Sequence, residues 1–84
     1  MDNRRLFERI AAGQVHNVRF ADFVRLVEAY GFQFIRRRGS HLLFQHPGIP
    51  DTFNLQQERG RAKPYQVRQM LRLIEEHKLE AHDV

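Results

Sequence analysis

The sequence predicts an α+β fold: a three-stranded antiparallel sheet with helices packed on one face and the other face open. Amphipathic segments with helical spacing occur before and after a central run of short alternating segments. Short turns separate the alternating segments, which is typical of antiparallel strands. Such a sheet buries one face against its helices, so the opposite face is available for binding.

Three helices are expected. Residues 2–12 place Leu6 and Ile10 four positions apart, and residues 21–30 carry an apolar face. The third helix begins at Pro64, because the first turn of a helix accepts proline. The apolar faces of the second and third helices contain Phe20, Phe23, Val24 and Val27, then Val67, Met70, Leu71 and Ile74.

Three strands are expected at residues 32–38, 42–46 and 52–56. A tight hairpin at residues 39–40 joins the first two, and residues 47–50 form a longer loop before the third. A polar loop follows the third strand. The order of elements is therefore helix, helix, strand, strand, strand, helix.

Alternation along the strands predicts which side chains share a face. Leu42 and Phe44 lie on one face of the second strand, and His41 lies on the other. When the apolar side chains face the helices, His41, Asn54 and Gln56 lie on the open face.

The composition excludes several classes of protein. The 84 residues are enough for one small domain, so residues 1–84 are expected to form a single domain. The chain has no cysteine, which excludes disulfides and cysteine-based zinc sites. No segment approaches the roughly 20 apolar residues of a membrane helix, and the charged start differs from a signal peptide. We expect a soluble, cytoplasmic protein with no membrane contact.

The positive charge is concentrated in the middle of the chain. The net charge is +4, but residues 31–68 contain seven basic and two acidic residues, a net charge of +5. The remainder contains seven basic and eight acidic residues. A basic region is typical of a phosphate-binding surface, and the alternative is an ordinary solvated face.

Cations and a histidine occur together around the first turn of the sheet. Three arginines precede a Gly-Ser turn, and a histidine follows it. Arginine binds phosphates, and histidine is the side chain that commonly transfers protons near neutral pH. This pattern predicts phosphodiester chemistry on a nucleic acid. The candidate residues are Arg36, Arg37, Arg38, Ser40 and His41.

As a general base, His41 would take the proton of a ribose 2′-OH, which restricts the reaction to RNA. The alternative is a turn histidine that only hydrogen-bonds the backbone.

Alternation places Arg37 on the opposite face from Arg36 and Arg38, so the three arginines cannot bind one phosphate. Their alternative role is to protect the edge of the sheet from aggregation. Lys63 precedes the last helix, whose N-terminus offers N–H groups to an RNA phosphate. The alternative is that Lys63 only keeps the loop soluble.

No metal site is expected. His41 and His46 are five positions apart on one strand, so they point to opposite faces. Asp51 and Glu58 are the only acidic residues of the basic region, and a two-metal site needs clustered carboxylates. No cofactor is expected either.

The central segment resembles the HicA-type toxins of bacterial HicAB toxin–antitoxin systems. The resemblance depends on Gly31-Phe32 after a helix, the arginine-rich turn with Gly39-Ser40-His41, the apolar strand, His46-Pro47 and the closing helix. It covers residues 20–79 and leaves residues 1–13 as an additional N-terminal helix. It implies a double-stranded-RNA-binding-domain-like fold.

The resemblance also implies a function. It implies a type II toxin that acts in stress responses, an endoribonuclease of the hydrolase class that cleaves mRNA without a metal, with His41 as the catalytic residue. The implied partner is a HicB-type antitoxin. Leu42 stands where many members have a second histidine, and the KPYQVRQ segment of the final helix also differs, which indicates a subfamily.

Two other functions are consistent with the same residues. One is a non-catalytic RNA-binding module, which the basic face alone would support. The other is a protein–protein adaptor whose basic surface binds an acidic partner.

Overall fold

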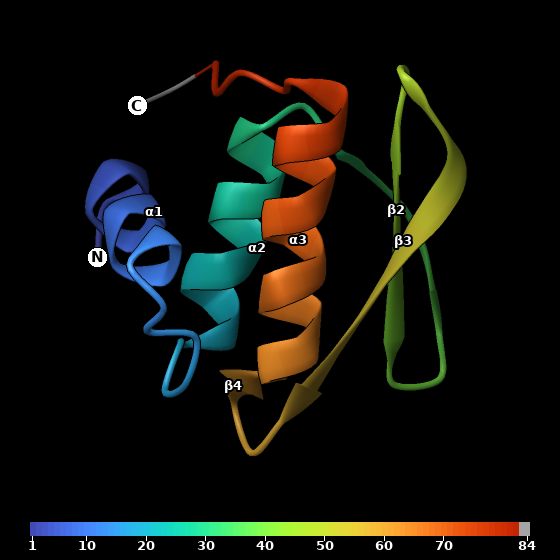
Figure 1. Ribbon diagram of the computed structural model, residues 1–84. Coiled ribbons are helices and arrows are strands. Elements are labelled where there is room, and N and C mark those ends of the chain that lie inside the picture. Colours follow the sequence, from blue (N-terminus) through green and yellow to red (C-terminus); the bar gives the residue numbers. More distant parts are fainter. Residues whose placement is uncertain (83–84) are drawn as a thin grey trace.

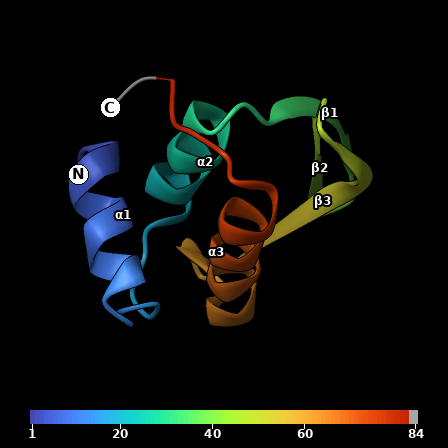
Figure 2. The same cartoon turned by 45° about the horizontal axis from the view of Figure 1, so that its top comes forward.

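The computed structural model describes residues 1–82 and confirms the predicted α+β class. The elements are α1 (Asn3–Ala11), α2 (Phe20–Ala29), β1 (Gln33–Arg38), β2 (His41–His46), β3 (Ile49–Glu58), β4 (Arg61–Ala62) and α3 (Pro64–His77). Neighbouring strands are antiparallel in the order β1-β2-β3-β4. The helices lie together on one side of the sheet, with α1 farthest from it, as Figure 1 and Figure 2 show. The arrangement is that of a double-stranded-RNA-binding-domain-like fold.

The sheet has four strands, so the predicted number of three was wrong. The expected polar loop is a tight turn at Arg59 and Gly60, both with positive φ (53° and 78°), and β4 then pairs with the end of β3. A strand of two residues is too short to produce a readable alternation. β3 is also longer than expected at both ends, because Pro47 and Gly48 alone form the preceding turn.

The core lies between the helices and one face of the sheet. Phe44 of β2 opposes Phe53 of β3, and Leu42 opposes Leu55, so these four side chains share the face toward the helices. Full burial of one such apolar side chain contributes roughly 1.5–3 kcal/mol. The prediction that these four apolar side chains of the second and third strands face the helices is confirmed. The largest fully buried side chains of α2 and α3 are Phe23, Leu26, Val27, Val67 and Met70.

The N-terminal segment, residues 1–19, contributes to the same core. Leu6 and Ile10 of α1 are 1% and 0% exposed, and Val15 and Val18 of the following loop are also buried. This burial explains the helical spacing seen in the sequence, since the two buried residues of α1 lie on the face toward α2.

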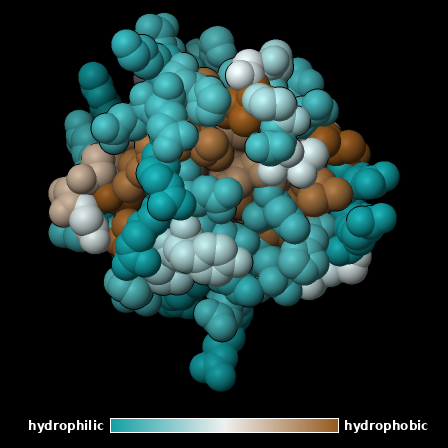
Figure 3. Space-filling view, turned by 45° about the vertical axis from the view of Figure 1, so that its right-hand side comes forward, coloured by the Kyte–Doolittle hydropathy of each residue, from teal (hydrophilic) through white to brown (hydrophobic). Residues whose placement is uncertain are grey.

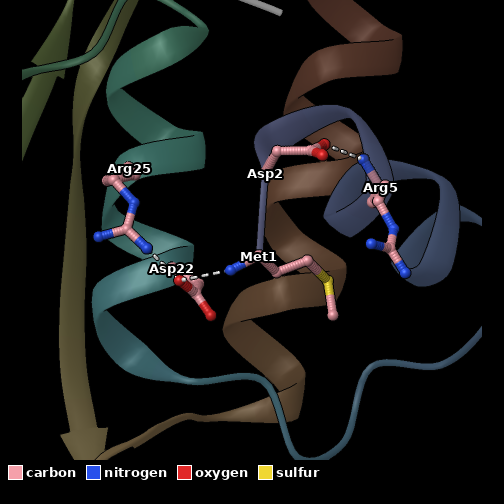
Figure 4. Close-up of polar contacts among 5 residues, drawn as sticks. All are labelled: Met1, Asp2, Arg5, Asp22 and Arg25. Atoms are coloured by element: carbon pink, nitrogen blue, oxygen red, sulfur yellow. Dashed lines mark hydrogen bonds and ion pairs between the residues drawn. The ribbon is translucent and has the colours of Figure 1, made fainter.

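Polar contacts fix the start of α1. The Asp2 side chain caps the helix by accepting a hydrogen bond from Arg5 N at 2.9 Å. The Met1 ammonium group lies 3.6 Å from the carboxylate of Asp22 in α2, and Arg25 binds the same carboxylate (Figure 4). Asp22 is nearly buried, and these two cations compensate its charge.

Among residues 1–82, no helix is long and apolar enough to cross a membrane.

Candidate active site

His41 lies at the first position of β2, directly after the Gly39–Ser40 turn. Gly39 has a φ of 61°, which a residue with a side chain rarely adopts, so glycine suits this turn. His41 opposes Arg38 of β1 and Gln56 of β3. All three side chains lie on the face opposite to the buried Phe44, since opposed residues share a face. The predicted position of His41 on the open face is confirmed.

Asn54 of β3 orients the ring of His41. His41 Nδ1 lies 3.0 Å from Asn54 Oδ1. An amide oxygen only accepts hydrogen bonds, so in the neutral ring this contact favours the tautomer with the proton on Nδ1 and the lone pair on Nε2. Within residues 1–82, no protein group hydrogen-bonds Nε2. The arrangement presents a half-buried imidazole whose free nitrogen can accept a proton from a ligand.

Gln56 connects two of the predicted phosphate ligands. Gln56 Nε2 donates to Ser40 Oγ at 2.8 Å, and Lys63 Nζ donates to Gln56 Oε1 at 2.9 Å. Gln56 also opposes His41 across the strand pair. Ser40, His41 and Lys63, which are up to 23 positions apart in the sequence, therefore surround one side chain.

Gln66 of α3 holds the strand that carries these residues. Its side chain is buried, at 4% exposure; Oε1 accepts from Gln56 N at 3.1 Å, and Nε2 donates to Asn54 O at 3.1 Å. The amide thus forms the pair of hydrogen bonds that a neighbouring strand would form. The burial of Gln66 could have been predicted from the sequence, because Gln66 lies four residues before Met70 and therefore on the same, buried side of the helix.

The three arginines of β1 are exposed, and they divide between the two faces as predicted. Arg38 opposes His41 and Arg36 opposes Leu43, so both lie on the open face, whereas Arg37 opposes Leu42 on the other. A β-bulge between Phe34 and Arg36 shifts the pairing of β1 with β2 by one residue, and this shift puts Arg36 and Arg38 on the face of His41. Arg38 is therefore the arginine that lies beside His41.

Sequence reasoning underrated Asn54, Gln56 and Gln66, none of which was among the predicted site residues. Alternation had placed Asn54 and Gln56 on the open face, but their partners depend on the register between strands. Register describes how two strands pair, and the pattern of one strand alone does not contain that information.

His46 lies at the other end of β2, and its surroundings are structural. Its ring packs edge-on against Phe32 at a centroid distance of 5.1 Å, and its Nδ1 accepts a hydrogen bond from Gly48 N at 3.0 Å. In the part of the chain that the structure describes, no group of three or more His, Cys, Asp or Glu residues is placed to hold a metal ion.

The surface on the sheet side of the molecule is mainly hydrophilic, with several hydrophobic patches (Figure 3). Phe34 and Ile35 of β1 are 51% and 44% exposed. The class defined by these observations is a small α+β protein of the double-stranded-RNA-binding-domain-like type, with a polar, cationic histidine site on its sheet.

The comparison with protein families identifies this protein's family. The family described as HicA toxin of bacterial toxin-antitoxin matches residues 20–75, and the chain belongs to it. The resemblance inferred from the sequence is therefore confirmed, and the protein is a toxin of a toxin–antitoxin system with a cognate antitoxin as its partner. No curated protein and no solved structure matches the chain. The match begins at Phe20, so α1 and the loop after it lie outside the matched region.

Proposed function

We propose that this toxin is an endoribonuclease that cleaves mRNA, with His41 as the general base. The observation that carries the proposal is the hydrogen bond between His41 Nδ1 and Asn54 Oδ1, which leaves Nε2 free to accept a proton. His41 Nε2 takes the proton of a ribose 2′-OH, and the 2′-oxygen attacks the adjacent phosphorus. The bond from phosphorus to the 5′-oxygen breaks, and the products are a 2′,3′-cyclic phosphate and a 5′-OH end.

Cations around His41 support the charge that develops on the phosphate. Arg38 lies opposite His41, and Lys63 is held on the same face through Gln56. Both can bind phosphate oxygens, and the Ser40 hydroxyl, which already accepts from Gln56, can donate to another. The side chains that surround His41 are neutral or cationic, so we propose that the reaction needs no metal ion. The departing 5′-oxygen takes its proton from solvent in this mechanism.

The cognate antitoxin is proposed to be of the HicB type and to neutralise the toxin by covering the cationic face. An acidic surface would complement Arg36, Arg38 and Lys63 and would exclude RNA from His41. Because the proposed substrate is mRNA, the proposed place of action is the cytoplasm.

The test compares the purified protein with His41→Ala on a defined single-stranded RNA. His77→Ala is the matched control, since His77 is an exposed histidine in the last turn of α3. We expect His41→Ala to lower the cleavage rate by roughly 10²–10⁴-fold, the usual contribution of general acid–base catalysis. The control should retain the rate, and circular dichroism should show that both variants are folded. EDTA should leave cleavage unchanged.

The substrate itself provides a second test. Replacing the 2′-OH with 2′-deoxy at the cleaved position should abolish cleavage, and the 5′ product should carry a cyclic phosphate. Equal cleavage of the deoxy substrate would refute His41 as a base acting on the 2′-OH. Binding of RNA without cleavage would favour the RNA-binding module, and no binding of RNA would favour the adaptor.

A further inference from the structure

A concave region lies at the β3–β4 turn, close to the start of α3. It is a cleft with a volume of about 500 Å³. His16 and Asn17 of the N-terminal segment form one wall, and Glu58, Arg59 and Arg61 of the hairpin form the other. One wall therefore comes from residues outside the matched family region.

The wall from the N-terminal segment is held by α1. Arg9 Nη2 donates to the backbone oxygens of His16 at 3.0 Å and of Asn17 at 3.2 Å. These two bonds fix a turn in which Asn17 has a positive φ of 58°. The guanidinium group of Arg9 thus places His16 and Asn17 against the hairpin.

The hairpin is joined to the same segment by backbone hydrogen bonds. Ala62 N donates to Val18 O at 2.8 Å, and Phe20 N donates to Gly60 O at 2.9 Å. Arg19 and Arg61 form an isolated antiparallel bridge between these bonds. Both walls of the cleft therefore have a defined spacing before any ligand binds, which lowers the entropic cost of binding.

The charges of the cleft favour an anion. Arg59 and Arg61 are exposed, and within residues 1–82 neither guanidinium forms an ion pair. Glu58 is the single acidic residue that lines the cleft, so the two arginines outweigh it. An unpaired guanidinium group with several donors is well suited to bind a phosphate oxygen.

The cleft and the His41 site share the strand β3. Gln56 and Glu58 are alternate residues of β3, so they share a face and lie roughly 7 Å apart along the strand. Lys63, which is bonded to Gln56, immediately precedes Pro64 at the edge of the cleft. A strand of RNA whose scissile phosphate lies at His41 can therefore extend along this face into the cleft.

We propose that the cleft binds a backbone phosphate of the RNA outside the cleaved position. The N-terminal segment thereby adds a phosphate-binding subsite that the matched family region alone does not form. This inference rests on the proposed function, because it requires RNA at His41. It assigns to Arg59 and Arg61 the binding of a phosphate, and to Arg9 the positioning of the cleft wall.

The experiment measures binding without cleavage, in the His41→Ala background, to a single-stranded RNA of about 12 nucleotides and to a dinucleoside monophosphate. Adding Arg59→Gln and Arg61→Gln should weaken binding of the longer RNA by roughly 10-fold and reduce the slope of log affinity against log salt by about one to two. The dinucleoside monophosphate carries only the phosphate that would lie at His41, so it should bind as before.

Two control variants test the sign and the position of the effect. Glu58→Gln removes the negative charge of the cleft, so it should strengthen binding of the longer RNA. The pair Arg4→Gln and Arg72→Gln removes the same charge from exposed positions of α1 and α3, and should change binding by less than about two-fold.

The outcomes separate this inference from the proposed function. If the His41→Ala protein binds neither RNA, the proposed function fails and the subsite fails with it. If RNA binds and both arginine pairs weaken it equally, the effect is one of general charge and the subsite is refuted. Unchanged RNA binding with loss of antitoxin binding would assign the cleft to the antitoxin and would also overturn the inference.

Discussion

The packing of α1 on the core and the placement of the side chains around His41 depend mainly on different interactions. Leu6 and Ile10 bind α1 to the core by apolar burial. Around His41, the exposed Asn54 and the half-buried Gln56 are placed by hydrogen bonds between side chains and to Gln66. Apolar burial stabilises without fixing direction, whereas a hydrogen bond fixes both distance and angle. The difference shows that apolar burial holds α1 in place, whereas hydrogen bonds set the positions of the side chains around His41.

The largest expected effect is on stability, from Ile10→Ala. This side chain is fully buried, and a large-to-small change of this kind typically lowers the free energy of unfolding by about 2–5 kcal/mol. Urea unfolding followed by circular dichroism measures it. Arg4→Ala, an exposed change in the same helix, should stay within about 0.5 kcal/mol. An unchanged urea midpoint for residues 20–82 in Ile10→Ala, with loss of the α1 signal alone, would contradict this expectation. It would show that α1 folds independently of the core.

The second effect concerns Gln66, where both kinds of interaction meet. Gln66→Leu keeps the buried volume close to the original but leaves Gln56 N and Asn54 O without partners. Each unsatisfied group costs roughly 1–3 kcal/mol, so unfolding should require distinctly less urea. Gln69→Leu, at a half-buried position of the same helix, is the matched control. Equal stability of Gln66→Leu and the parent would show that the apolar contacts alone hold the edge of β3.

A smaller effect, on cleavage only, is expected from Asn54→Ala. A hydrogen bond is worth about 1 kcal/mol, so loss of the Asn54 contact should reduce the cleavage rate by roughly five-fold through a less ordered His41 ring. The free energy of unfolding should change by less than about 0.5 kcal/mol, because Asn54 is exposed. Asn54→Asp retains the accepting oxygen, so the cleavage rate at saturating RNA should be retained, although the added negative charge should weaken RNA binding. A large loss of stability in Asn54→Ala would contradict the separation of the two regions.

The smallest effect is a dependence on alkaline pH at the contact of α1 with α2. Burial raises the pKa of Tyr30, which packs against Phe7 at a centroid distance of 5.8 Å. Because the pKa is higher in the folded state, the unfolded chain loses this proton first as the pH rises. The resulting contribution to stability is complete below the ordinary value of 10.0 and is lost as the pH rises through the folded pKa.

Urea unfolding between about pH 8 and 11 measures this dependence. Tyr30→Phe should remove the tyrosine component of the decline, and Tyr65→Phe should leave it, since Tyr65 is 58% exposed. An identical decline in the parent and in Tyr30→Phe would show that groups other than Tyr30 dominate the alkaline loss of stability.

Local sequence patterns predicted most of the fold. Helical spacing located the first two helices to within one residue at each end and the start of the third, and alternation placed Phe44 and Leu55 toward the helices. The strand β4 was missed because two residues carry no periodicity, and the start of β3 was missed because Pro50 was assigned to a loop. Both errors occur where pairing with a neighbouring strand, and not local preference, decides the conformation.

The site was predictable only in part. The Gly39–Ser40 turn predicted His41 as a candidate, and the basic region predicted Lys63; both assignments stay predictions. The connection of Lys63 to Ser40 through Gln56 was not predictable, because it joins three elements. The cleft was equally inaccessible, since its walls are brought together by backbone hydrogen bonds between residues about 40 positions apart.

By itself, the sequence determined the helices, the two-residue alternation of the strands and the basic, histidine-containing turn, because these depend on neighbouring residues and on their side-chain chemistry. Tertiary structure decided which side chains meet. The β-bulge at Ile35 shows this directly: Phe34 packs on Phe44 toward the helices, and the inserted residue turns Arg36 and Arg38 toward the His41 face. Without the bulge, strict alternation would place Arg37 there instead. Register and bulges depend on packing between strands, and a strand's own pattern does not contain that information.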